Sequence, residues 1–287
     1  MGRQNTEVSG MAEDLALWRR ELLDAEIHDR INQDQRTTPD TFLGHPRHRV
    51  FAEVIGGGQA EFDQPMGGLS GDDRALLYAK FNQQRHLDEQ DHGFSQLFGA
   101  EGRAVRPTIL DVGCGPFTVG LSVAKALGAD KPFRYFGIDR SAAMLRLGER
   151  LAAGAGERGA FHPETRVAFG QDLSTVDFGQ PRGELTVIVA SYLLASPTLD
   201  VVPLVASLVD ALSRIGPGPA AVFYTNSAHA QATSKFPSFR DEFVRNGFAV
   251  EVDEIVRFAE TKTPKDLHYA LLFRPAKMTI SVPRATQ

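Results

Sequence analysis

Residues 109–118 read ILDVGCGPFT, and the rest of the chain is organised around them. Apolar residues lead to Asp111, glycines follow at Gly113 and Gly115, and apolar residues then recur at helical spacing from 119 to 127. This pattern predicts a buried strand, a tight turn and a helix, which together form the first unit of a βαβ fold. The glycines let the backbone turn sharply and let a ligand approach without meeting a Cβ atom. The start of the helix would point free N–H groups at that ligand.

Two classes of cofactor bind at such a turn. A dinucleotide site expects G-x-G-x-x-G, whereas this chain has Thr118 at the third glycine position. The S-adenosylmethionine site of class I methyltransferases begins with an acid two residues before G-x-G, and Asp111, Gly113 and Gly115 resemble that motif closely. The family often has a third glycine two residues further on, where this chain has Phe117. The resemblance therefore implies either a narrowed methionine end of the pocket or altered cofactor use.

Acidic residues at later strand ends extend the resemblance. Asp139 closes the apolar run 133–139, at a point where a carboxylate can accept both ribose hydroxyls in either cofactor class. Asp172 follows a short strand at 166–169, where methyltransferases place a group that hydrogen-bonds the adenine amine, and Leu173 matches the residue that packs on the ring. The resemblance assigns the cofactor site to Asp111, Gly113, Gly115, Phe117, Asp139, Arg140, Asp172, Leu173 and Ser191.

The remaining pattern predicts the order of the fold. Further strands are expected within 184–194 and at 220–225, 250–258 and 268–274, with helices at 200–212 and 236–246 between them. The last two strands resemble the antiparallel hairpin that closes the class I sheet. The fold class is therefore α/β, with a Rossmann-like class I methyltransferase sheet of seven mostly parallel strands. We expect residues 1–105 to form an N-terminal helical cap and 106–287 to form the S-adenosylmethionine-binding domain.

Composition narrows the class of protein. The chain has 287 residues, of which 42% are hydrophobic, and it has no apolar run long enough for a membrane span and no apolar signal core. A single cysteine, Cys114, excludes an internal disulfide and is typical of a cytoplasmic protein. The favoured interpretation of Cys114 is a small residue packed under the cofactor. The net charge of −5 gives no general basic surface for nucleic acid.

The N-terminal region carries helical patterns. Leu15, Trp18, Leu22 and Ala25 recur at helical spacing within 11–33 and predict an amphipathic helix that packs on the domain or on a partner subunit. The glycine-rich residues 56–71 indicate a loop or a lid. The run 70–73 resembles a capping box, so a helix is expected from there to about residue 91, with a break at Gly93.

One face of that second helix carries candidate acceptor-binding residues. Tyr78, Phe81, Asn82 and Arg85 lie near one face, which either closes over the cofactor and binds substrate or simply packs. Tyr192, at the end of the fourth strand, joins Tyr78, Asn82 and Arg85 as a candidate substrate residue. The cluster of His86, Asp88, Asp91 and His92 invites a metal hypothesis, although polar helix faces produce such clusters readily, and we expect no metal.

Three functions fit the sequence. The first is methyl transfer to a small molecule, which the acidic balance and the helical cap favour. The second is methylation of RNA, and the third is a non-catalytic module that binds S-adenosylmethionine, with Phe117 as its best support. A base is needed only if the acceptor must lose a proton, and Tyr192, Tyr224, His86 and His92 are candidates of which none stands out. A homodimer is an open alternative to a monomer, and a membrane partner is not expected.

Overall fold

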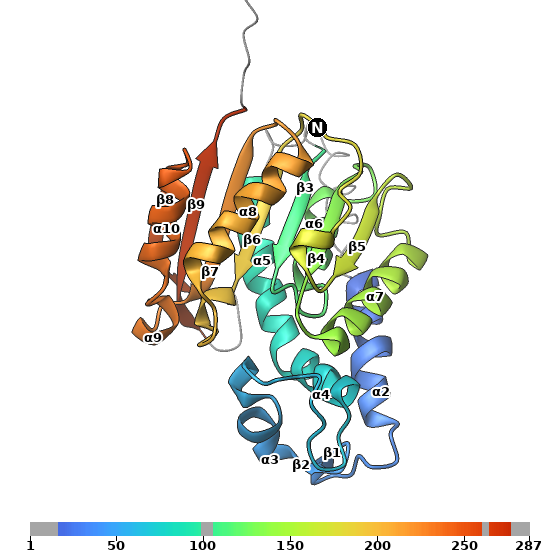
Figure 1. The fold of residues 1–287 in the computed structure, drawn as a ribbon. Coiled ribbons are helices and arrows are strands. Elements are labelled where there is room, and N and C mark those ends of the chain that lie inside the picture. Colours follow the sequence, from blue (N-terminus) through green and yellow to red (C-terminus); the bar gives the residue numbers. More distant parts are fainter. Residues whose placement is uncertain (1–16, 99–105, 260–263, 277–287) are drawn as a thin grey trace, which may run out of the picture.

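A seven-stranded sheet forms the centre of the protein, and the N-terminal segment lies beneath one of its edges (Figure 1). The computed structural model describes residues 17–98, 106–259 and 264–276. The strands are β3 (Thr108–Val112), β4 (Arg134–Ile138), β5 (Arg166–Gly170), β6 (Thr186–Ser191), β7 (Ala220–Ser227), β8 (Ala249–Phe258) and β9 (Lys265–Arg274). Their order is β5-β4-β3-β6-β7-β9-β8, in which the first five are parallel and β9 is antiparallel to both neighbours. This order confirms the predicted Rossmann-like class I methyltransferase sheet and its C-terminal hairpin.

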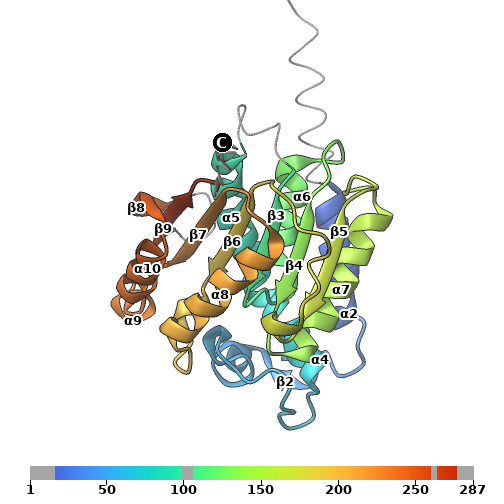
Figure 2. The ribbon, with the colours of Figure 1, turned by 45° about the horizontal axis from the view of Figure 1, so that its top comes forward.

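Helices cover both faces of the sheet (Figure 2). They are α5 (Gln84–Leu97), α6 (Thr118–Leu127) and α7 (Ala142–Glu157) on one face, and α8 (Val201–Ile215) and α10 (Phe236–Arg245) on the other. Successive strand residues point to opposite faces, so Ile109 packs in the first layer and Leu110 in the second, and both are fully buried. The central parallel strands β3, β4, β6 and β7 are buried on both faces, which is why their sequences are largely apolar, whereas the edge strand β5 is partly exposed.

The N-terminal segment adds a further helical layer. Residues 17–23 are helical and continue through the π-helical η1 (Asp24–His28) into α2 (Asp29–Asn32). Trp18 and Leu22 are buried in the same hydrophobic cluster as one face of the sheet, and Leu22 packs against Gly154 of α7. The expected helix therefore packs on the domain, although Leu15 lies outside the described residues.

A long helical stretch leads from this segment to the sheet. It consists of α4 (Gly71–Tyr78), the π-helical η4 (Ala79–Gln83) and α5. The predicted capping box is confirmed, because the side chain of Ser70 accepts from the Asp73 N–H and Asp73 accepts from the Ser70 N–H. The predicted break at Gly93 is wrong, and the helix runs on to residue 97. Gly93 serves close packing instead, since a Cβ atom there would overlap the ring of Phe223 on β7.

Short elements complete the described residues. They are β1 (Thr41–Phe42), β2 (His45–Pro46), α3 (Arg47–Arg49), η2 (Val50–Val54), η3 (Gly56–Gly58), η6 (Leu173–Thr175), η7 (Leu193–Ala195) and α9 (Ala230–Thr233). Among the helices of the described ranges, none combines the length and the apolar character that crossing a membrane requires.

Candidate functional site

A cavity of about 720 Å³ lies at the carboxyl ends of the parallel strands. Ligands of open α/β sheets bind at this edge, where the strand order reverses. Nine predicted site residues line the cavity, namely Gly113, Gly115, Asp139, Arg140, Asp172, Leu173, Ser191, Tyr78 and Tyr192. The structure thus brings together residues from β3, β4, η6, β6 and the N-terminal segment. Asp111, Phe117, Asn82 and Arg85 do not line this cavity.

The glycine turn forms the floor of the cavity. Gly113 and Gly115 have φ angles of 71° and 52°, a left-handed conformation that favours glycine. The Gly115 N–H donates to Asp139 Oδ2 at 2.9 Å, and Asp139 Oδ1 accepts from the Ser141 N–H at 2.9 Å. Burial raises the pKa of Asp139, and these two hydrogen bonds oppose the rise. Each carboxylate oxygen keeps a free lone pair with which to accept a hydroxyl.

Asp172 and Leu173 form another wall. The Asp172 carboxylate accepts from the Ser174 N–H at 2.8 Å and so caps η6, and this hydrogen bond lowers its pKa. The side chain of Leu173 is buried against the sheet and contributes an apolar surface to the cavity. A charged oxygen and an apolar surface thus meet at one wall, as the resemblance implied for an adenine site.

Asp111 lies beneath the turn rather than in the cavity. It is buried, and its Oδ2 accepts from the Tyr135 hydroxyl at 2.6 Å. Burial raises the pKa of Asp111 to about 7, although the hydrogen bond from Tyr135 acts in the opposite direction. The neighbouring thiol of Cys114 is also buried, and burial raises its pKa well above the ordinary value. This agrees with the prediction that Cys114 is a packed residue rather than a nucleophile.

The side chain of Phe117 turns away from the cavity. Its backbone is left-handed, with φ 66°, and its fully buried ring packs edge-on against Tyr135 and Phe169. Gly120 leaves room for this ring, because a Cβ atom there would overlap it. The Phe117 ring therefore does not narrow the cavity. The left-handed backbone directs the ring into an aromatic cluster behind the turn.

The glycine-rich N-terminal loop forms the opposite wall. Residues 58–63 line the cavity, and Asp63 accepts from the N–H groups of Ala142 and Ala143 at the start of α7 and from the Ser141 hydroxyl. These three hydrogen bonds anchor the loop to α7, the helix that follows Asp139. Glu61 also pairs with Arg140 at 2.6 Å, although both side chains are exposed and the pair adds little.

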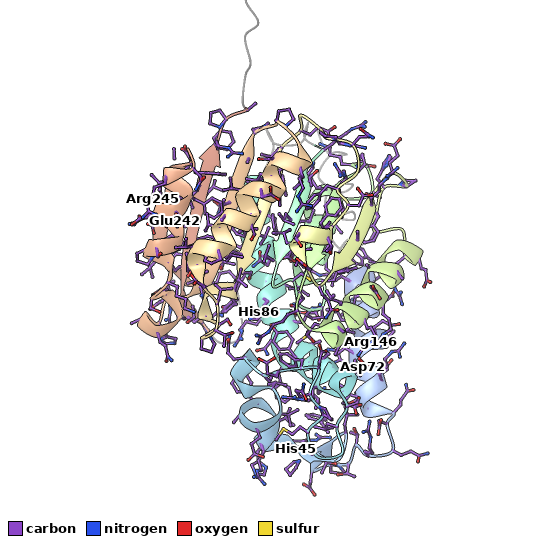
Figure 3. The ribbon with its side chains drawn as sticks, viewed as in Figure 1. His45, Asp72, His86, Arg146, Glu242 and Arg245 are labelled. Atoms are coloured by element: carbon purple, nitrogen blue, oxygen red, sulfur yellow. The ribbon has the colours of Figure 1, made fainter. Side chains whose placement is uncertain are left out.

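A buried polar network surrounds Tyr192. Its hydroxyl donates to Glu89 Oε2 at 2.9 Å and accepts from Lys265, whose Nζ lies 2.5 Å from Glu89 Oε1. His86 stacks on the ring of Tyr192 at 4.3 Å, and Figure 3 shows His86 where α5 passes between the sheet and the N-terminal segment. Tyr192 has a left-handed backbone, with φ 57°, and such strain in a non-glycine residue persists only where surrounding contacts fix it.

The four candidate bases differ in where they lie relative to the cavity. Burial lowers the pKa of His86 well below its ordinary value and raises that of Tyr192, so both are neutral at physiological pH. Of the two, only Tyr192 lines the cavity. Tyr224 is buried on the other face of the sheet, stacked on Phe236. His92 packs near Phe258 of the C-terminal hairpin.

The acidic residues near His86 have other partners. Asp91 binds Arg19 and Lys125, at 2.6 and 2.7 Å, and Asp88 accepts from Gln84. In the part of the chain that the structure describes, no three His, Cys, Asp or Glu side chains are grouped as metal ligands would be.

Several site residues escaped the sequence reasoning. Glu61 and Asp63 lie in a loop without a periodic pattern, so no local signal marks them. Glu89 was detectable, because it continues the helical spacing of 78, 82 and 85. Lys265 follows a turn that is remote in sequence, and only the antiparallel pairing of β9 brings it to Glu89.

The charge of the cavity is one-sided. Among the described residues that line it, five are carboxylates, namely Glu61, Asp63, Asp139, Asp172 and Asp200, and one is a guanidinium, Arg140. A cleft lined mostly by one sign of charge raises the local concentration of ligands of the opposite sign. This cavity therefore favours a cationic ligand over a polyanionic one.

Among known proteins, similarity was found to solved structures only. No protein-family model and no curated protein matches the sequence. Magnesium protoporphyrin IX methyltransferase from Synechocystis PCC 6803 is 15% identical with a TM-score of 0.44, over 79% of this chain and 90% of that one. A SAM-dependent methyltransferase from Methanosarcina mazei is 16% identical with a TM-score of 0.39, over 59% and 93%. An arsenic(III) S-adenosylmethionine methyltransferase from Chlamydomonas reinhardtii is 15% identical with a TM-score of 0.39, over 60% and 65%. Similarity this low says nothing about the reaction.

Proposed function

We propose that the protein is an S-adenosylmethionine-dependent methyltransferase that acts on a small molecule in the cytoplasm. The observation that carries the proposal is the cavity itself. On a sheet of class I order, it gathers two left-handed glycines, the acids Asp139 and Asp172 and the apolar surface of Leu173. Its volume of about 720 Å³ lies in the range of sites that enclose a cofactor-sized ligand.

The donor and acceptor set fits this cofactor better than a dinucleotide. S-adenosylmethionine carries a sulfonium cation, which the acidic lining attracts. A dinucleotide carries a pyrophosphate, which the excess of five carboxylates over one guanidinium would repel. Phe117 gives no reason to expect lost turnover, because its ring lies in the core and leaves the cavity open.

The residues of this chain would bind and orient the reactants. Asp139 would accept hydrogen bonds from the ribose hydroxyls, and Asp172 would accept one from the adenine amine. Leu173 would pack on the adenine ring. When bound, the cofactor supplies an activated methyl group, so the protein needs to provide alignment and electrostatics. The loop 58–63 and Tyr78 wall the cavity and would exclude water from the reacting atoms.

Thermal unfolding with added ligand tests the cofactor class. S-adenosylmethionine and S-adenosylhomocysteine should each raise the melting temperature, because a ligand at one hundred times its dissociation constant stabilises the native state by about 2.7 kcal/mol. NAD⁺ at the same concentration should not. Stabilisation by NAD⁺ alone would refute the proposal.

The acceptor class needs a separate experiment. The acidic lining disfavours an RNA backbone, because RNA-binding surfaces neutralise phosphates with lysine and arginine. Incubation with a cell extract and methyl-labelled cofactor should place the label in the small-molecule fraction. Label in the RNA fraction, together with RNA binding that weakens steeply with salt, would support the alternative acceptor instead.

A further inference from the structure

Three polar side chains at the junction of η4 and α5 are buried without full hydrogen bonding. Asn82 Nδ2, Gln83 Oε1 and Arg85 Nε have no partner among the described residues, and Asn82 and Gln83 are each 1% exposed. A buried polar atom without a partner destabilises the folded state. Three such atoms lie within four residues of one helical stretch.

The chemistry of the existing bonds fixes the polarity of each free atom. Gln83 donates from Nε2 to the Pro116 carbonyl at 3.1 Å, and because a carbonyl only accepts, the free atom of Gln83 is an acceptor. Arg85 donates to Asn82 Oδ1 at 2.9 Å, and because a guanidinium only donates, the free Asn82 atom is a donor. The stretch therefore offers two donors, one of them cationic, and one acceptor.

Arg85 is also a cation without a counterion. Among the residues the structure describes, no carboxylate pairs with it, and the nearby Glu89 is already paired with Lys265. A half-buried guanidinium that lacks a carboxylate is stabilised by an anionic ligand. The cavity lining is mostly acidic, so an anionic group is best held beside Arg85.

These atoms lie next to the cavity. Pro116, the partner of Gln83, directly follows Gly115 of the cavity floor. Gly58 lines the cavity, and a Cβ atom there would come 3.9 Å from Asn82 Nδ2. The π-helical turn of η4 buries the adjacent residues Asn82 and Gln83 together, and such turns are frequent at functional sites.

Resting on the proposed function, we infer that Asn82, Gln83 and Arg85 bind the zwitterionic amino-acid end of the cofactor. Arg85 and Asn82 donate to its carboxylate, and Gln83 accepts from its ammonium group. This assignment makes Asn82 and Arg85 cofactor-binding residues, whereas the sequence analysis placed them among the candidate acceptor-binding residues. It also gives the carboxylate a cationic partner, because Arg85 pairs with no carboxylate among the described residues.

Binding of two related ligands by calorimetry tests the inference. S-adenosylhomocysteine has the amino-acid end, whereas 5′-deoxy-5′-methylthioadenosine keeps the adenosine and the sulfur but lacks that end. Arg85→Met should weaken S-adenosylhomocysteine about 10- to 100-fold and change methylthioadenosine less than twofold. Gln83→Leu is an independent second variant with the same expected pattern, at about five- to tenfold. Unchanged methylthioadenosine binding shows that each variant has folded.

Two further variants bracket the result. Asp139→Ala should weaken both ligands alike, because both carry the ribose. Arg146→Met should weaken neither, since Arg146 pairs with Asp72 on the outer surface (Figure 3). Equal weakening of both ligands in Arg85→Met and Gln83→Leu, or no weakening in either variant, overturns the inference. A wild-type protein that binds neither ligand overturns the proposed function itself, and is a different result.

Discussion

Loss of the Lys265 ammonium group should destabilise the protein in a pH-dependent way. Glu89 is fully buried, and its carboxylate is held by Lys265 at 2.5 Å and by the Tyr192 hydroxyl at 2.9 Å. Removing one partner of a buried pair leaves an uncompensated charge and costs about 3–5 kcal/mol. The side chain of Lys265 is 21% exposed, so we take the lower end of that range. For Lys265→Met, about 3 kcal/mol corresponds to a fall in Tm of about 6–12 °C.

The sign of the pH dependence follows from Glu89. Burial already raises its pKa, while Lys265 lowers it, so the Lys265→Met variant raises the pKa further. A carboxyl whose folded pKa exceeds its unfolded value loses stability as the pH rises through the folded pKa. Glu89 in the variant is protonated and neutral at acid pH. The loss of stability should therefore be smaller at pH 5 than at pH 8.

Urea unfolding at both pH values measures this effect. The double variant with Glu89→Gln should recover most of the lost stability, because no charge is then left buried. Arg146→Met is the matched control, since it breaks an exposed pair and should cost less than about 1 kcal/mol. A loss in Lys265→Met that equals the control and does not change with pH would refute the reasoning.

Three further outcomes are expected. Gly93→Ala should destabilise the protein by about 1–3 kcal/mol in urea unfolding, because the added methyl group overlaps the ring of Phe223. Adding Phe223→Leu should restore part of the loss, and equal stability of Gly93→Ala and wild type would contradict the packing. Asp63→Ala should cost about 0.5–2 kcal/mol through the lost cap of α7 and should also weaken S-adenosylhomocysteine in calorimetry; a folded variant with wild-type affinity would remove the loop from the site. The pKa of Asp111 in the folded protein is raised to about 7. The stability of wild type relative to Asp111→Asn should therefore decrease as the pH rises from about 4 to about 7, and an increase over that interval would contradict the burial argument.

Local sequence determined the framework of the candidate cofactor site. The glycines of 109–118, the acid Asp139 and the pair Asp172 and Leu173 all follow directly after predicted strands. Parallel strands bring their carboxyl ends to one edge, so residues in these positions converge whatever the detailed packing. That is why the sheet and its hairpin could be predicted without coordinates, and why seven of the nine residues assigned to the cofactor lie at the cavity.

Only the tertiary structure decided where side chains point and which distant residues meet. Phe117 occupies a motif position, but its ring entered the core because Gly120, three residues on, leaves it room. Glu89 and Lys265 are separated by most of the fold, and the antiparallel pairing of β9 brings them together. Backbone periodicity reports the face on which a residue lies, whereas side-chain partners depend on packing between elements far apart in the chain.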